Sequence, residues 1–515
     1  MKVFILLLVL ATALIAVESA DAQGLGDAVR VSTDPLPAGT RGMSMGGAMI
    51  SAANDYNALT WNPAALAPLE FNELGFGLWD GQHNSNATFF NAPKSDETGS
   101  FNLGGFGLLY HTPTDRGHLN LGLSYDLVRS YASTYSFSAI NPSSSFLNTV
   151  GFVSDPKLDY RDTSNVNYLG YTNLAWNMYL ANLNPARDAL VPVVPINFAG
   201  GMTQSGTVTE SGALHALRLG GGVDVADGIS IGVTLNFYDG EFNHERDYTE
   251  ADSNHVVPPD TSHSPAYVLK SATIHDSRTQ TQSGFGLKIG FLDYANDLLR
   301  FGFTIETPTY MRLHDWFLRT GSVTFVGQEP LNIDESYGLQ PIVNNYAVVT
   351  PFKLGAGISS KIGGLTIEAS GTYSDLSATR YTDWDVDLSD LNDSVKASLR
   401  SVISWNLGAE FVIPAIGTSL RVGYSMEPSP YKGDPSNYAK TTMSAGVGIL
   451  FNSRFIMELG YSRTSYHTSH VLYSDNVVGT LAPVTAGISD DAVSRDQFML
   501  SFNYRFGEPD GTHDR

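Results

Sequence analysis

Large apolar side chains alternate with small or polar ones in one segment after another, and this alternation constrains the fold more than any other feature. Successive side chains on a β-strand point to opposite faces, so one face of each segment would be uniformly apolar. Segments of this kind recur along the whole chain and give about fourteen strands, an even number, as single-chain bacterial transmembrane barrels have. The predicted fold class is therefore all-β, a transmembrane antiparallel β-barrel. In the last segment the apolar set is Phe498, Leu500, Phe502, Tyr504 and Phe506.

The connections between these segments alternate in length. Tight turns rich in turn-forming residues are predicted at 114–117, 226–228, 295–297, 363–364, 414–417 and 452–454. Long loops are predicted between them, at 80–99, 139–210, 249–263, 327–344, 379–395, 427–437 and 467–491. In barrels of this kind the short turns face the periplasm and the long loops face the exterior. A soluble β-sandwich would also alternate, but it would not confine its long loops to one end so regularly.

The N-terminus has the features of a cleavable secretion signal. Lys2 precedes the apolar run Val3–Val17, and Ala20 and Ala22 form an A-x-A cleavage site. The mature chain is expected to begin near Gln23. No later stretch offers the roughly 18 consecutive apolar residues that a transmembrane helix needs, so no helical span is predicted.

Composition narrows the classes of function. The chain has 515 residues, a formal net charge of −22 and no cysteine. An acidic protein repels polyanions, so nucleic acid is excluded as a partner. The 50 glycines, 25 tyrosines and 26 phenylalanines, with only 16% charged residues, favour one large barrel over several soluble domains.

Charged residues of both signs fall on the face of the strands that is not apolar. A charge facing lipid would cost about 2–4 kcal/mol at the membrane midplane, so these residues are predicted to line the lumen. There they would pair with one another, or else contact a substrate directly. The set is Arg218, Lys288, Arg300, Glu306, Lys353, Glu368, Glu410, Arg421, Glu458 and Arg505.

A segment before the first strand is rich in small residues and ends in an Asn-Pro-Ala motif. It runs from Gly39 to Leu66, and the motif is Asn62, Pro63 and Ala64. This segment resembles the N-terminal signature of the FadL family of outer-membrane transporters for long-chain fatty acids and other hydrophobic compounds. The resemblance implies a fourteen-stranded barrel whose N-terminal segment folds inside the lumen as a hatch. Together with the signal sequence, this resemblance predicts four parts of the chain. They are a signal peptide at 1–22, a hatch at 23–68, a barrel at 69–506 and a periplasmic tail at 507–515.

The residues of this segment are also reasonable for a hatch on physical grounds. Small side chains let a chain pack inside a crowded lumen, and Pro63 fixes φ and removes a backbone donor where the hatch turns into the wall. The alternative is an ordinary periplasmic lead-in with an Asx turn at Asn62. Trp61, just before the motif, is closer to PorV-like relatives, which act in protein secretion to the cell surface.

Two short patterns imitate catalytic or metal sites. Residues Gly42–Gly46 match the G-x-S-x-G nucleophile elbow, but neither the preceding strand nor the following helix that the elbow needs is evident. Residues Asp383–Asp387 imitate a calcium loop, but Leu388 replaces its glycine and Ser394 its final glutamate. No enzymatic activity, metal site or cofactor is predicted.

The loop at 139–210 carries many large apolar residues. Tyr171, Leu174 and Met178 share one helical face at spacings i, i+3 and i+7, which exposed loops avoid unless the face packs or binds something. The FadL resemblance implies that such a loop captures the hydrophobic ligand first, so these three residues are the predicted ligand-binding set. The alternative is that the loop folds over the barrel mouth and buries itself.

Together these observations predict outer-membrane transport of hydrophobic small molecules, by capture at extracellular loops and passage through a hatch-gated barrel. The expected partners are a hydrophobic ligand, outer-membrane lipid and lipopolysaccharide. The alternative function is a PorV-like role with secretion partners. A third class, an open hydrophilic pore, would need a lumen without a hatch.

Overall fold

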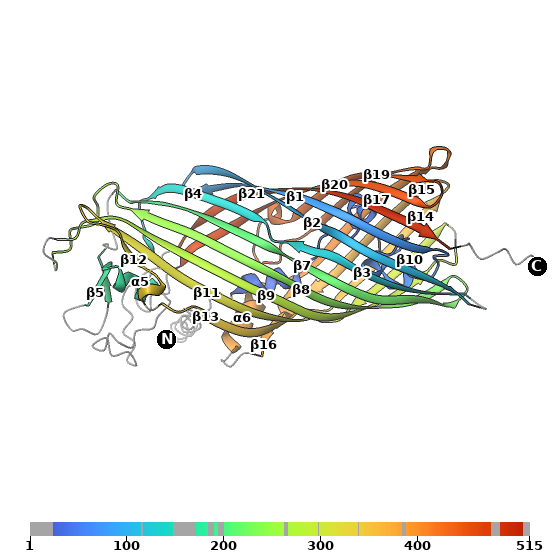
Figure 1. The fold of residues 1–515 in the computed structure, drawn as a ribbon, viewed down its shortest axis with the longest axis horizontal. Helices are drawn as coiled ribbons and strands as arrows, with labels where there is room; N and C mark the ends of the chain where they lie inside the picture. Colours follow the sequence, from blue (N-terminus) through green and yellow to red (C-terminus); the bar gives the residue numbers. More distant parts are fainter. Residues whose placement is uncertain are drawn as a thin grey trace, which may run out of the picture.

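The chain forms a closed barrel of fourteen antiparallel strands (Figure 1). The computed structural model describes residues 24–114, 117–147, 171–183, 190–193, 200–261, 266–296, 298–337, 339–383, 388–474 and 485–507. Each strand of the wall pairs with the next along the sequence, and the last pairs with the first, with Asn72 opposite Phe506. The predicted fold class and number of strands are confirmed.

Counting the strands of eight residues or more, eleven positions of the wall are single strands, and three consist of two strands in line. The single strands are β1 (Asn72–Phe89), β2 (Ala92–Pro113), β7 (Met202–Ala226), β8 (Ile229–Ala251), β9 (Leu269–Asp293), β15 (Leu365–Asp375), β17 (Ser401–Ile413), β18 (Thr418–Glu427), β19 (Lys440–Phe451), β20 (Phe455–Ser474) and β21 (Thr485–Phe506). The composite positions are β3 (His118–Ser130) with β4 (Ser133–Asn141), β10 (Leu299–Glu306) with β11 (Tyr310–Phe325), and β14 (Lys353–Ile362) with β13 (Ile342–Val349).

The two faces of the wall differ as the alternation predicts. On β9 the outward residues Phe285, Ile289 and Phe291 are all exposed, whereas the inward residues Gln280 and Gln282 are buried. The same apolar band continues around the barrel on the other strands. Such a band is the surface that a membrane-spanning barrel presents to lipid.

Short turns join the strands at one end of the barrel, here called the turn end. Gly117, Gly228, Gly363 and Gly417 adopt positive φ there, where a side chain would be strained. The other end, here called the loop end, carries the longer connections, together with α5 (Tyr171–Asn177), α6 (Ser389–Ser398), and the short strands β5 (Ala181–Leu183), β6 (Leu190–Pro192), β12 (Leu331–Ile333) and β16 (Arg380–Thr382).

Several predicted loops prove to be strand. The predicted loop at 80–99 is wrong, because β1 and β2 extend through it and join in a tight turn at Phe90 and Asn91, with φ of 45° and 62°. Strands β8, β20 and β21 likewise extend into the predicted loops at their ends. Beyond the apolar band both faces of a strand are polar, so the alternation that reveals a strand disappears while its backbone pairing continues.

The N-terminal segment lies inside the barrel, where Figure 1 shows it in blue between the walls. It forms α2 (Leu25–Ser32), α3 (Thr40–Ser44), α4 (Ala58–Trp61) and the 3₁₀ helix η1 (Pro63–Leu66). Almost every residue from Ala38 to Leu66 is buried. Among the described residues, no helix has the length and apolar character needed to cross a membrane.

Replacing Ile289 with arginine should destabilise the barrel much more than the same change at Thr281, on the same face of β9 but beyond the apolar band. The first puts a charge in hydrocarbon at a cost of about 2–4 kcal/mol, and the second leaves it near the interface at about 0–1 kcal/mol. Urea unfolding of both variants in lipid vesicles measures the difference. Equal losses would mean that the band does not face lipid.

Candidate functional site

The Asn-Pro-Ala motif connects the N-terminal segment to the barrel wall. Asn62 is fully buried, and its Nδ2 donates hydrogen bonds to the carbonyl oxygens of Ile50, at 2.8 Å, and Phe291, at 3.0 Å. Its Oδ1 accepts from the Ala64 amide at 3.1 Å, an Asx turn that starts η1 with Pro63 as its first residue. One side chain therefore closes the turn, holds the hatch together and binds the wall.

Two glycines in the wall make this contact geometrically feasible. A Cβ on Gly290 would lie 2.0 Å from Asn62 Oδ1, and a Cβ on Gly232 would lie 2.3 Å from the Pro63 carbonyl carbon. Ser230 Oγ also donates to the Ala64 carbonyl oxygen at 2.9 Å. The motif therefore lies directly against the backbones of β8 and β9, closer than any side chain would permit.

A buried ion-pair network holds the hatch to the opposite side of the wall. Arg41 of α3 donates to both carboxylate oxygens of Glu410, at 2.9 and 3.0 Å. Arg421 bridges Glu410, at 2.5 Å, and Glu458, at 2.7 Å. Burial alone would lower the pKa of Arg41, but the charge of Glu410 outweighs it and raises the pKa above its ordinary value. The sequence predicted that Glu410, Arg421 and Glu458 line the lumen and either pair or contact a substrate, and here they are paired. It did not reveal Arg41 as their partner.

Other lumenal carboxylates accept hydrogen bonds from the hatch backbone. Glu368 accepts from the amides of Ser51 and Ala52, each at 2.8 Å. Glu73 accepts from the Tyr56 amide at 3.1 Å and pairs with Arg505 at 2.8 Å. These bonds satisfy amide groups of a segment without regular secondary structure, which would otherwise be buried without partners.

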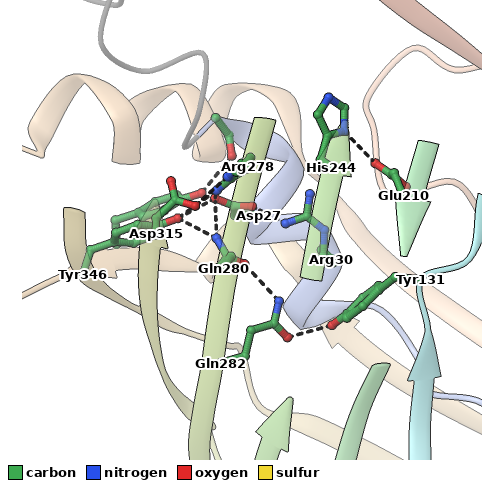
Figure 2. Close-up of polar contacts among 12 residues, drawn as sticks. Asp27, Arg30, Tyr131, Glu210, His244, Arg278, Gln280, Gln282, Asp315 and Tyr346 are labelled. Carbon is green, nitrogen blue, oxygen red and sulfur yellow. Dashed lines mark hydrogen bonds and ion pairs between the residues drawn. The ribbon is translucent and has the colours of Figure 1, made fainter. Parts of the chain in front are cut away.

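Helix α2 is fixed separately, nearer the loop end, by the network in Figure 2. The buried carboxylate of Asp27 lies 2.8 Å from the Arg278 guanidinium and accepts from the Tyr346 hydroxyl at 2.6 Å. Arg278 also binds Asp315 at 2.6 Å. Arg30 pairs with Asp27, and its guanidinium lies 3.6 Å from the centre of the Phe242 ring. Asp27 and Arg30 of α2 thus contact side chains of three wall strands, β8, β9 and β13.

A cavity of about 390 Å³ separates α2 from the hatch. Its lining includes the extended segment 34–37, which joins the two, and wall residues of most strands. Lys353 pairs with Asp34 across it at 3.0 Å, and Lys288 pairs with Glu306 at 3.1 Å. The N-terminal chain therefore occupies the lumen at two levels, with this cavity between them.

The wall is interrupted beside this cavity. The hydrogen-bonded ladder between β2 and β3 ends at Gly105 and Asp126, and beyond that point β3 and β4 pair with β7 while β2 pairs with β1. Within the described strands, side chains bridge the space that remains: Ser100 Oγ lies 3.0 Å from Ser130 Oγ, and Ser136 donates to Asp96 at 2.6 Å. The sequence did not predict this interruption, because the alternation in β3 ends at Tyr125 and does not mark β4 as a strand.

Comparisons with known proteins agree with this architecture. The crystal structure of the Pseudomonas putida toluene transporter TodX superposes with a TM-score of 0.53 at 13% identity, over 92% of this chain and 100% of that one. A Pseudomonas aeruginosa FadL homologue gives 0.54 at 14% identity, over 92% and 99%. The fold is FadL-like. No family model and no curated protein sequence matches the chain.

An apolar cluster lies at the mouth of the FadL-like barrel. Leu174 and Met178 are buried in it with Phe137, Phe146 and Tyr248. A Cβ on Gly321 of β11 would lie 3.0 Å from both Leu174 and Met178, so the loop lies directly against the wall. The predicted helix is present, and two of its three predicted ligand-binding residues face inward and not toward solvent. The side chain of Tyr171 lies outside the described residues.

The two patterns that imitate other sites have structural explanations or fall outside the description. Ser44 of the G-x-S-x-G pattern is buried in the hatch, where its Oγ donates to the Thr40 carbonyl oxygen at 2.7 Å. Most of the acidic run, at 384–387, lies outside the described residues. Among the described residues no cluster of three or more histidine and acidic side chains is arranged to hold a metal.

The docking of α2 in the FadL-like barrel should resist mild acid. Burial alone would raise the pKa of Asp27, but the charges of Arg278 and Arg30 lower it to about 2. A carboxylate with a lowered pKa stabilises the fold above its ordinary pKa of about 3.9 and loses that effect as the pH falls toward 2. We therefore expect amide exchange in α2, corrected for intrinsic rates, to stay slow from about pH 7 to pH 5 and to rise near pH 3.

Asp27→Asn should raise this exchange between about pH 4 and pH 7, and Asp334→Asn, which changes a partly exposed carboxylate next to β12, should not. Loss of protection already between about pH 7 and pH 5 would contradict an Asp27–Arg278 latch.

Proposed function

We propose that this chain is an outer-membrane protein that takes up hydrophobic small molecules, long-chain fatty acids among them. The loop end would face the exterior and capture the ligand at the apolar cluster. The ligand would then enter the cavity below α2. TodX, with the same fold, is described as a toluene transporter, which supports an apolar ligand class for this proposal.

The observation that carries the proposal is the interruption between β2 and β3. It begins at Gly105, beside the outward residue Phe106, which is 40% exposed, and passes Phe101, which is 67% exposed. The interruption therefore begins within the part of the apolar band that is nearer the loop end. On its inner side Leu36 donates its amide to the Val128 carbonyl oxygen at 2.9 Å, next to the cavity. An apolar solute could leave the cavity sideways into the membrane.

Energetic magnitudes favour this side route over movement of the hatch. Releasing the hatch would break the buried ion pair of Arg41 with Glu410, and leaving a buried charge without its partner costs about 3–5 kcal/mol. It would also break the hydrogen bonds of Glu368 to the hatch amides. Opening the wall breaks fewer and weaker contacts. The hydrogen bond between Ser100 and Ser130 is worth about 0.5–1.5 kcal/mol, and each bond from Ser136 to the Asp96 carboxylate about 1.5–3 kcal/mol. We therefore propose that the hatch stays in place while the interruption opens, although passage through a shifted hatch remains the competing mechanism.

Cross-linking the interruption tests this route, since the chain has no cysteine of its own. A Ser100→Cys, Ser130→Cys double variant should form a disulfide, because the two Oγ atoms are 3.0 Å apart. We expect oxidation to abolish uptake of a labelled hydrophobic compound into proteoliposomes or cells, and a reductant to restore it.

The matched control is a Thr442→Cys, Thr464→Cys pair, whose hydroxyl oxygens are 2.8 Å apart on the strands β19 and β20 that are already paired. Its oxidation should leave uptake unchanged. If the oxidised Ser100–Ser130 variant transports as well as the reduced one, the side route is wrong and passage through the hatch becomes the better account.

Capture at the mouth predicts an affinity that rises with ligand chain length. Each buried methylene contributes about 0.8 kcal/mol, so binding of a fatty-acid series should strengthen until the site is full. Leu174→Asn with Met178→Gln should flatten this slope, because both side chains lie inside the apolar cluster. Val471→Asn, which changes an exposed residue of β20, should keep it. A steep slope retained in the double variant would move the lipid site away from α5.

A further inference from the structure

Three buried nitrogen atoms on the lumenal side of the seam between the first and last strands have no partner within the described part of the chain. They are Nε1 of Trp79, Nδ1 of His83 and Nε of Arg495. Trp79 is 5% exposed and His83 is 6% exposed. Buried polar atoms are satisfied in nearly all native proteins, so three neighbouring exceptions indicate that something binds them.

Strand register and a glycine bring these atoms together. His83 of β1 lies opposite Arg495 of β21, and Gly81 lies opposite Gln497. A Cβ on Gly81 would lie 2.2 Å from Cη2 of Trp79, so the indole ring occupies the space over Gly81 and extends along the strand toward His83. The absence of a side chain at Gly81 is thus what places Trp79 beside the other two residues.

The three side chains line one small cavity. Its volume is about 20 Å³, and its lining also includes Leu36, Ser130 and Gln497. This volume suits one occupant about the size of a water molecule. The cavity shares Leu36, Ser130, Arg495 and Gln497 with the larger lumenal cavity, so an occupant can enter from there.

The donor set defines what this occupant must be. The indole N–H and the guanidinium N–H can only donate, so the occupant must accept at least two hydrogen bonds. Arg495 also has no carboxylate partner within the described residues. Two acidic residues on the same strand are engaged elsewhere: Asp491 with His470 and Ser85, and Asp496, which also lines the cavity, with Tyr461 and Arg463.

We propose that this cavity is a binding site for one small monovalent anion of the halide class, such as chloride. A water molecule would satisfy the hydrogen bonds but would leave the charge of Arg495 uncompensated. The bound anion would join β1 to β21 and to Ser130, at the point where β3 separates from β2. The site is independent of the proposed transport function.

Thermal unfolding of the full barrel in detergent tests the site. Chloride is exchanged for gluconate at constant ionic strength, so that only specific binding changes the melting temperature. We expect the melting temperature of the wild type to rise with chloride concentration, and that of Arg495→Gln and Trp79→Phe not to change. Arg463→Gln, which removes an exposed arginine from β20, should respond as the wild type does.

A wild type without chloride dependence, or equal dependence in Arg495→Gln, would overturn the proposal. If Arg495→Gln fails to fold, Trp79→Phe carries the comparison, because it keeps the ring and removes only the donor. Crystals of the wild type grown in bromide give a second measurement. An anomalous peak within hydrogen-bonding distance of Trp79 Nε1 is expected, and an ordered water without anomalous signal would also overturn the proposal.

Discussion

A chain that crosses lipid with strands must pair both edges of every strand, because no water is present to satisfy the backbone. The ladder from Asn72 opposite Phe506 onward closes the sheet and meets this requirement. It also restricts where the wall can open. The interruption between β2 and β3 begins only at Gly105 and Asp126, in the part of the apolar band nearer the loop end. There, unpaired backbone groups can reach water or side chains. The proposed exit is thus located where the membrane tolerates one.

Closure of the wall creates a second problem, since a barrel of this width encloses a lumen too wide for wall side chains alone to fill. The N-terminal segment fills it at two levels, and buried charges hold both. Arg41 with Glu410 fixes the hatch, and Asp27 with Arg278 fixes α2. Buried pairs add little net stability compared with apolar packing, but they specify one position because any displacement leaves a charge unpaired. Position matters here, since the cavity exists only while both parts are in place.

Sequence alone predicted the wall well, because lipid imposes an apolar face on every strand and a register error would turn charges such as Glu410 outward. It also predicted the pairing of lumenal charges, and the helix at Tyr171–Asn177. It failed wherever the second face was also polar, as in β1 beyond Asp80, because no alternation remained to mark the strand. It could not reveal Asp27 with Arg278, which are 251 positions apart, or the approach of Asn62 to Gly290. Those contacts depend on the three-dimensional path of the hatch, which local patterns do not encode.

The central claim is that the N-terminal segment closes the lumen. Single-channel conductance in planar bilayers tests it most directly, comparing the intact barrel with a variant lacking residues 40–60, after both are shown to be folded by circular dichroism. The wild type should pass little steady current, and the deletion should open a large, stable conductance. Equal conductance in a correctly folded deletion variant would contradict the claim that this segment is the plug.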